Sequence, residues 1–417
     1  MKSRLINIIL RSLTLVSKLV LIFILAHFFA ASEVGVYGLI STSIGYMLYL
    51  VGLEFYIYTN RKIITSRPYM YGAILKNQFA LYIINYILII SILTPIVFYK
   101  KLMPLDIYFW IIMILFFEHW AQEFNRLLIS LSKQIIASQI LFIRSGLWIL
   151  ISIPFIIASE RYRNIDFILF LWLLGSIIAC LIALLKLGKE ITYWPKGIKW
   201  SFIRAGIIIS LPFVVSTLAT RALFTIDKYW FNFLTNLELL GVYTFFTSIS
   251  ISLTSFLDAA VFSFLYPMLI KAKTSSEQFR KMMSKMIKQT LLLIIVFVII
   301  ALSTIEFVLS LIDNKIYLNN QWMFGWTLMA SIIFSLGFIP QYGLYALEED
   351  KYIILSSLLG FTLFLITTYI FSFYRPDLAV LLGVNIGLLS SAIFKVVALI
   401  VKAPKEYLWK KQKISAF

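Results

Sequence analysis

The stretch IDFILFLWLLGSIIACLIALLK, residues 165–186, carries charge only near its two ends, at Asp166 and Lys186. About twenty consecutive apolar residues are what an α-helix needs to cross the hydrocarbon core of a bilayer. Similar stretches lie on both sides of this one, separated by polar loops. The sequence therefore predicts an all-α polytopic membrane protein with twelve transmembrane helices, at about residues 5–29, 36–59, 77–99, 105–131, 136–158, 165–186, 201–225, 237–267, 288–312, 320–347, 352–374 and 378–401.

The composition excludes a soluble protein, because 61% of the 417 residues are hydrophobic and only 13% are charged. A bilayer requires every backbone polar group to be paired internally, which favours helices of this length. One cysteine, Cys180, and two histidines, His27 and His119, cannot build a disulfide framework, a zinc site or an iron–sulfur site. We expect no cofactor, no metal site and no catalytic residue.

The basic residues give a formal net charge of +18, but they lie in short loops between apolar segments. This distribution argues against nucleic acid as a partner. The loops on the side of the two termini carry 24 Lys and Arg, whereas the opposite loops carry 6. Positively charged loops stay in the cytoplasm. We therefore expect both termini to be cytoplasmic in a bacterial inner membrane, with the first helix retained because no cleavage site follows it.

A short motif occurs twice. Glu33-Val-Gly-Val-Tyr37 opens the second helix, and Gly241 and Tyr243 of a similar motif, which begins at Glu238, stand 206 residues after Gly35 and Tyr37. Both copies follow a helix that leaves the cytoplasm, which predicts two pseudo-symmetric six-helix bundles. The predicted divisions are an N-terminal bundle (1–188), a basic amphipathic cytoplasmic linker (189–200), a C-terminal bundle (201–402) and a basic cytoplasmic tail (403–417).

Twelve helices, cytoplasmic termini, two six-helix halves and the Glu-x-Gly-x-Tyr motif together resemble the O-antigen and polysaccharide repeat-unit flippases. These belong to the multidrug, oligosaccharidyl-lipid and polysaccharide exporter superfamily. The resemblance implies that the substrate is an undecaprenyl-diphosphate-linked oligosaccharide, moved from the cytoplasmic to the periplasmic leaflet. It also implies membrane lipid as a partner, together with the polysaccharide polymerase and the chain-length regulator of the same pathway.

Two transmembrane stripes are cationic. The first helix carries Asn7, Arg11, Thr14 and Lys18 on one face, and the seventh carries Ser210, Thr217, Arg221 and Lys228. A charge near the bilayer centre costs roughly 2.5–3.5 kcal/mol, so such stripes should face protein or water. We predict that they line one cationic cavity, with Lys18 and Arg221 engaging the diphosphate. Arg11, Lys228 and Arg144 of the fifth helix would support them.

Other readings of these cations stay open. Arg11 could extend to the cytoplasmic interface, and Lys228 lies beside Asp227. For Lys395, near the cytoplasmic end of the last helix, we favour extension to the interface.

The residues that could couple or gate transport are Asp258, Glu123, Glu54, His119 and Pro212. Glu123 and Arg126 are three residues apart, which favours an internal ion pair, and Glu54 could pair with Arg61. Asp258 has no basic residue at helical spacing and could titrate or bind a cation. His119 could respond to protons or be an ordinary buried polar residue, and Pro212 could bend the seventh helix.

The predicted mechanism is alternating access with no bond made or broken. Proton or sodium coupling is possible but not required by any residue. A multidrug or cation antiporter of the same superfamily would need a cavity dominated by carboxylates instead of basic stripes. A membrane polysaccharide polymerase or glycosyltransferase would need a sizeable external loop, and every external loop here is short.

Overall fold

The computed structural model describes residues 2–100, 104–188, 190–191, 193–404 and 406, and this part of the chain is helical with no β-strand. The helices of the first half are α1 (Lys2–Phe28), α2 (Ala31–Gly52), α3 (Tyr56–Thr65), α4 (Tyr71–Lys100), α5 (Leu105–Ser130), α6 (Gln134–Phe142), α7 (Trp148–Ala158) and α8 (Ile165–Leu187). A π-helical segment, η2 (Ile143–Leu147), joins α6 to α7. Short 3₁₀ turns, η1 (Pro68–Met70) and η3 (Glu160–Tyr162), precede α4 and α8.

The second half begins with α9 (Trp200–Leu234) and continues with α10 (Leu237–Leu257), the π-helical segment η4 (Asp258–Phe262) and α11 (Ser263–Lys271). After the turn η5 (Ala272–Thr274) come α12 (Ser276–Ile312), α13 (Lys315–Asn319), α14 (Trp322–Ala346), α15 (Asp350–Ser372) and α16 (Pro376–Lys402).

Eleven of the described helical segments are long and apolar enough to cross a membrane. The twelfth predicted span is α5, a 26-residue helix that also carries Asp106, Glu118, Glu123 and Arg126. The described residues thus form an all-α membrane fold of twelve transmembrane helices, six from each half of the chain. Every predicted span coincides with a helix, but the prediction of one continuous helix over 36–59 was wrong. That segment is broken between α2 and α3.

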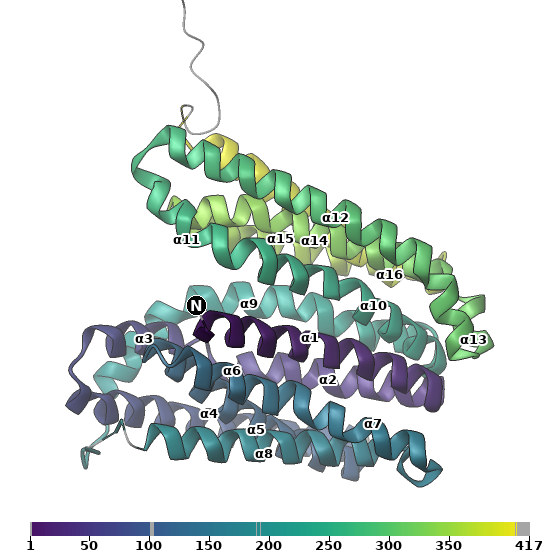
Figure 1. The fold of residues 1–417 in the computed structure, drawn as a ribbon, viewed down its shortest axis with the longest axis horizontal. Helices are drawn as coiled ribbons and strands as arrows, with labels where there is room; N and C mark the ends of the chain where they lie inside the picture. The colour runs from purple at the N-terminus through teal and green to yellow at the C-terminus, as the bar shows by residue number, and fades with distance from the viewer. Residues whose placement is uncertain (1, 101–103, 189, 192, 405, 407–417) are drawn as a thin grey trace, which may run out of the picture. The chain divides into compact units, whose positions relative to one another are not determined.

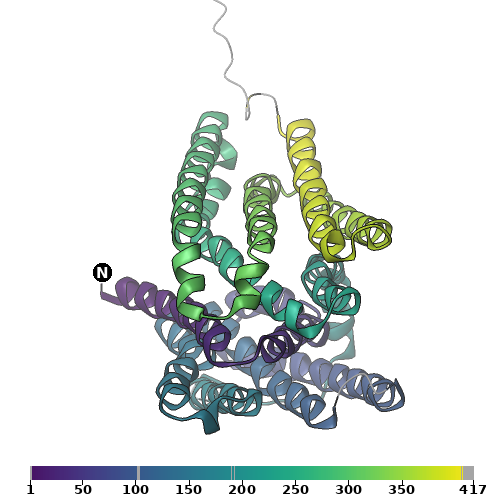
Figure 2. The same ribbon diagram turned by 90° about the vertical axis from the view of Figure 1, so that its right-hand side faces the viewer.

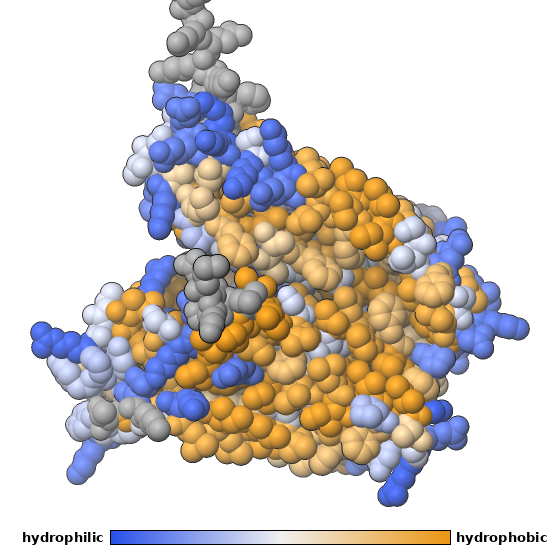
Figure 3. Space-filling model, in the orientation of Figure 1, coloured by the Kyte–Doolittle hydropathy of each residue, from blue (hydrophilic) through white to orange (hydrophobic). Residues whose placement is uncertain are grey.

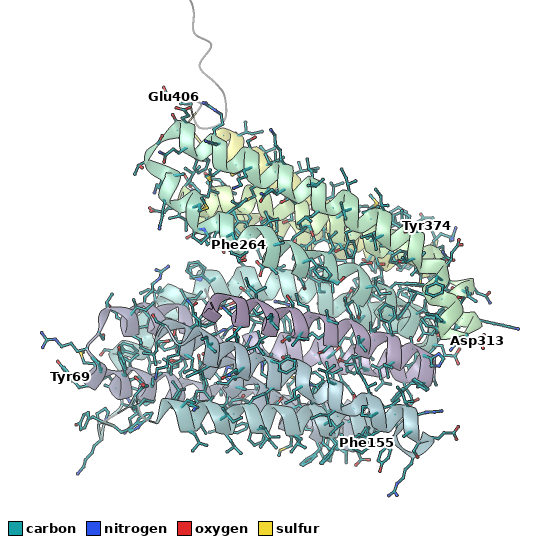
Figure 4. The ribbon with its side chains drawn as sticks, viewed as in Figure 1. Tyr69, Phe155, Phe264, Asp313, Tyr374 and Glu406 are labelled. Carbon is teal, nitrogen blue, oxygen red and sulfur yellow. The ribbon has the colours of Figure 1, made fainter. Side chains whose placement is uncertain are left out.

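The chain forms two compact units. Unit 1 comprises Met1–Phe29 and Tyr37–Leu218, and unit 2 comprises Ala30–Val36 and Ala219–Phe417. In unit 1, α5 packs on α8 and α1 packs on α6, and the long helices run side by side (Figure 1). Tyr69 and Phe155 lie near opposite ends of this unit's helices (Figure 4). In unit 2, α14 contacts α10, α12 and α16, and it lies between α12 and α16 in Figure 2.

Each unit has the surface of a membrane protein. Hydrophilic residues gather toward the ends of the helices, and the face between them is mostly apolar (Figure 3). The interior of each unit is packed with apolar side chains, such as Phe124 and Ile140 in unit 1 and Phe279 and Met286 in unit 2. Apolar side chains exposed to lipid cost nothing, so helix association here depends on close packing and on polar contacts between helices.

The repeated motif has a structural reason. A Cβ atom on Gly35 would overlap the carbonyl oxygen of Leu237, and one on Gly241 would overlap the carbonyl oxygen of Ala31. The two contacts are reciprocal, because each glycine meets the residue four positions before the other glycine. Only glycine permits backbones to approach this closely. The two copies therefore pack against each other at the N-terminal ends of α2 and α10.

Candidate functional site

The predicted stripe on α1 divides into two kinds of residue. Ser138 of α6 donates a hydrogen bond to Asn7, and Thr14 is buried and donates to the carbonyl oxygen of Leu10 at 2.8 Å. Arg11 and Lys18 are exposed. The short polar side chains thus serve packing within unit 1, whereas the two long cations are exposed.

The predicted stripe on α9 divides in the same way, within unit 2. Arg221 is exposed, but Lys228 is buried, with Nζ 3.8 Å from Oδ2 of Asp227. Oδ2 of the fully buried Asp227 also accepts a hydrogen bond of 2.7 Å from the Tyr243 hydroxyl. Tyr243 borders a cavity of about 20 Å³, which has room for about one water molecule. Lys228 is therefore compensated inside unit 2.

Arg144 lies in the π-helical segment η2 and is compensated in unit 1. Its Nη1 is 3.3 Å from Oε1 of Glu118 on α5, and both side chains are about nine-tenths buried. The other carboxylate oxygen of Glu118 accepts 2.9 Å from the Ser176 hydroxyl on α8. Three helices thus share one buried ion pair.

Glu123 is the centre of a second buried network in unit 1. Oε1 is 2.6 Å from Nη1 of Arg126, which confirms the predicted internal pair. Oε2 accepts hydrogen bonds of 2.6 Å from the Tyr82 hydroxyl and 2.9 Å from Nε2 of Gln78. The Arg126 guanidinium lies over the Tyr56 ring, with Cζ 3.7 Å from the centroid. Four polar groups and an aromatic face therefore neutralise one another away from water.

The break between α2 and α3 is strained. Leu53 and Glu54 have φ values of 46° and 49°, a left-handed conformation that residues other than glycine rarely adopt. Asn85 of α4 donates a 2.8 Å hydrogen bond to the carbonyl oxygen of Val51 and so satisfies one group near the break. Strained backbone and interrupted helices cluster at functional sites of transporters. The only sequence signal was Gly52 at the end of α2.

Two buried groups beside this break lack hydrogen-bond partners among the described residues. One is Oε2 of Glu54, whose carboxylate is bonded to the Tyr56 hydroxyl instead of to Arg61, and the other is His119, at both ring nitrogens. His119 is fully buried, and a Cβ atom added to Gly52 would lie 3.1 Å from its Nε2. The α2–α3 break, Glu54 and His119 therefore form one cluster in unit 1.

The remaining predicted residues are Asp258, Pro212 and Lys395. Asp258 is exposed and begins the π-helical segment η4. Pro212 is exposed inside the continuous helix α9. The expectation for Lys395 was wrong, because its side chain is buried and Nζ donates 2.9 Å to Oε1 of Gln341 on α14. The α14–α16 contact brings in an amide partner that sequence spacing within α16 cannot show.

Parts of the predicted linker and tail, at residues 189, 192, 405 and 407–417, lie outside the described residues. Within the described part of the linker, Lys76 Nζ donates to the carbonyl oxygens of Pro195 at 2.6 Å and Lys196 at 2.8 Å. The backbone N–H of Lys199 donates 2.6 Å to Oδ1 of Asn77. The linker is thus held against the start of α4.

No family model and no curated protein matches the chain. Its fold matches solved structures of the MOP superfamily. The MATE multidrug transporter DinF-BH is 14% identical, with a TM-score of 0.62 over 97% of this chain and 95% of that chain.

A MOP superfamily transporter from Pyrococcus furiosus, described as having a binding pocket of reverse polarity that suggests a different function, is 14% identical, with a TM-score of 0.54 over 97% and 94%. An outward-facing MATE multidrug transporter is 14% identical, with a TM-score of 0.52 over 96% and 91%. These neighbours are transporters and not enzymes. The chain is a multi-pass membrane protein with the MATE transporter fold.

Proposed function

We propose that this protein is a flippase that moves an undecaprenyl-diphosphate-linked oligosaccharide, an O-antigen or similar repeat unit, across the bacterial inner membrane. The observation that carries the proposal is the exposure of three basic residues on helices that cross the membrane. Arg11, Lys18 and Arg221 are exposed on helices that cross the membrane. Three of the intramembrane acids, Glu118, Glu123 and Asp227, are buried against basic partners, and Asp258 and Glu306 are exposed.

An anionic substrate fits this distribution of charge. A diphosphate carries about two negative charges and many acceptor oxygens, which Lys and Arg complement with short charge-assisted hydrogen bonds. We assign its binding to Lys18 and Arg221, with Arg11 in support. Arg144 and Lys228 would first have to leave Glu118 and Asp227, so they are not part of the proposed contact. The neighbour described with a binding pocket of reverse polarity, which suggests a different function, supports variation in pocket polarity on this fold.

The sequence supports the proposed direction and setting. The bias of basic loops supports cytoplasmic termini and loading from the cytoplasmic leaflet. Transport would proceed by alternating access and deliver the repeat unit to a periplasmic polymerase and chain-length regulator. We assign gating to the α2–α3 break with Glu54 and His119, because strained backbone and interrupted helices cluster at functional sites of transporters.

The test is the amount of lipid-linked repeat unit in the inner leaflet of cells that lack the protein. Wild type should clear the accumulated intermediate, whereas Lys18→Ala combined with Arg221→Ala should not, although it reaches the membrane at the same level. A matched control is Lys315→Ala, which changes a basic residue outside the spans. Clearance by the double variant would refute the diphosphate contact.

A second candidate is a multidrug or cation exporter, and the fold neighbours favour it because two of those compared are multidrug transporters. Asp258, an exposed carboxylate within a span, would then bind the cation. Under this reading Asp258→Asn abolishes drug resistance in a susceptible host, and Lys18→Glu with Arg221→Glu leaves it intact. The flippase proposal predicts no drug resistance from any of these proteins.

A further inference from the structure

The aromatic side chains of α14 form a continuous stripe in unit 2. Phe334, Phe338, Tyr342 and Tyr345 are four, four and three residues apart, which places them on one face of the helix. Ring centroids are 4.9 Å apart for Phe334 and Phe338 and 6.0 Å apart for Phe338 and Tyr342. Tyr266 of α11 extends the surface, 4.8 Å from Tyr342 and 6.3 Å from Tyr345. We call these five residues the α14 aromatic stripe.

The stripe lies at the edge of the core, because Phe338, Tyr342 and Tyr345 pack against the buried side chains of unit 2. Its five rings are all partly exposed, whereas α14 buries intervening residues such as Ser335, Ile339 and Leu344. From Phe334 to Tyr345 the helix rises roughly 16 Å. The partly exposed rings are therefore spread along the helix, and this arrangement suits a chain of sugar rings better than a single compact molecule.

Polar groups border this apolar surface. The Asp258 carboxylate, in the π-helical segment η4, lies within electrostatic range of the Tyr342 hydroxyl. The Asp350 carboxylate, at the start of α15, likewise lies within electrostatic range of the Tyr266 hydroxyl. Carboxylates accept several hydrogen bonds each, and phenols both donate and accept. π-Helical turns within α-helices are frequent at functional sites.

We propose that the α14 aromatic stripe, with Asp258 and Asp350, binds the oligosaccharide head group of the substrate. Pyranose rings have an apolar C–H face that packs on aromatic rings, and their hydroxyls pair with phenols and carboxylates. The inference rests on the proposed flippase function and assigns a subsite to it. A polyprenyl tail would need no bordering acids, and a single organic cation would need rings grouped around one point.

The test separates recognition of the sugar from recognition of the diphosphate. Purified full-length protein in nanodiscs is titrated with two probes: undecaprenyl diphosphate, and the lipid-linked oligosaccharide extracted from the host membrane. Wild type should bind the glycosylated probe more tightly than the bare one. Phe338→Leu and Tyr342→Leu should each weaken the glycosylated probe about five- to tenfold and leave the bare diphosphate unchanged.

The matched control is Tyr369→Leu on α15, which removes an exposed aromatic ring in contact with Phe373 and should change neither affinity. Unchanged affinity for the bare diphosphate shows that each variant is folded. If wild type binds both probes and the stripe variants still favour the glycosylated one, the subsite is refuted and the flippase function stands. Loss of tetraphenylphosphonium binding in Tyr342→Leu would assign the stripe to cations instead. If wild type binds neither probe, the proposed function fails as well.

Discussion

Charged residues within the spans occur in two settings. Those around Glu123 form a buried network, whereas the cations Lys18 and Arg221 of α1 and α9 are exposed. Around Glu123, one carboxylate is held by Arg126, Tyr82 and Gln78 within unit 1. On α1 and α9, Lys18 and Arg221 are exposed at positions within the spans. A buried charge with several partners stabilises one arrangement of helices, whereas we propose that the exposed cations within the spans contact the substrate. The comparison predicts that stability and transport depend on different charges.

The largest expected effect on stability is in the buried network. Glu123→Ala removes the carboxylate that is hydrogen-bonded to the partly buried Arg126 guanidinium and leaves Tyr82 and Gln78 without their acceptor, so it should lower the free energy of unfolding by about 3 kcal/mol. The measurement is unfolding by SDS in mixed micelles. The matched change Lys18→Ala should move the same free energy by less than about 0.5 kcal/mol. If both variants lose the same free energy of unfolding, the buried network and the exposed cations do not differ in their contribution to stability.

The pair formed by Arg144 and Glu118 should follow at about 3 kcal/mol for Arg144→Met, because one buried carboxylate loses its cation. The same unfolding assay on Arg144→Met combined with Glu118→Gln should recover part of this loss, since no buried charge remains. Additive losses in the double variant would mean that the two residues act independently.

A substitution at the break between α2 and α3 should raise the free energy of unfolding instead of lowering it. Leu53→Gly removes the strain of a left-handed residue and should raise the free energy of unfolding by about 1 kcal/mol. Leu50→Gly, within the regular part of α2, should lower it by about 1 kcal/mol. If both substitutions destabilise the protein equally, the positive φ at Leu53 carries no strain.

Lys395 gives the smallest effect. Replacing a buried amine by an apolar chain of similar length removes a desolvation cost and one hydrogen bond to Gln341, so Lys395→Met should change the free energy of unfolding by less than about 1 kcal/mol. A loss of several kcal/mol in the unfolding assay would place Lys395 with Glu123 as a charge on which the fold depends.

The spans could be read from the sequence because bilayer thickness fixes their length. The segment predicted at 165–186 is the helix Ile165–Leu187. Hydropathy is blind to the left-handed turn at Leu53 and Glu54, since both flanking segments are helical. It is equally blind to partners from other helices, such as Tyr82 for Glu123 and Gln341 for Lys395. The stripe on α1 was predictable, but which of its members are exposed was not.

The most direct test of the central claim is a comparison of anion and cation binding by the purified protein. Wild type in nanodiscs should bind undecaprenyl diphosphate, and Lys18→Glu combined with Arg221→Glu should lose that binding at least tenfold while unfolding at the same SDS concentration. Neither protein should bind tetraphenylphosphonium. Wild type that binds tetraphenylphosphonium and not the diphosphate, with no change on charge reversal, would contradict the account.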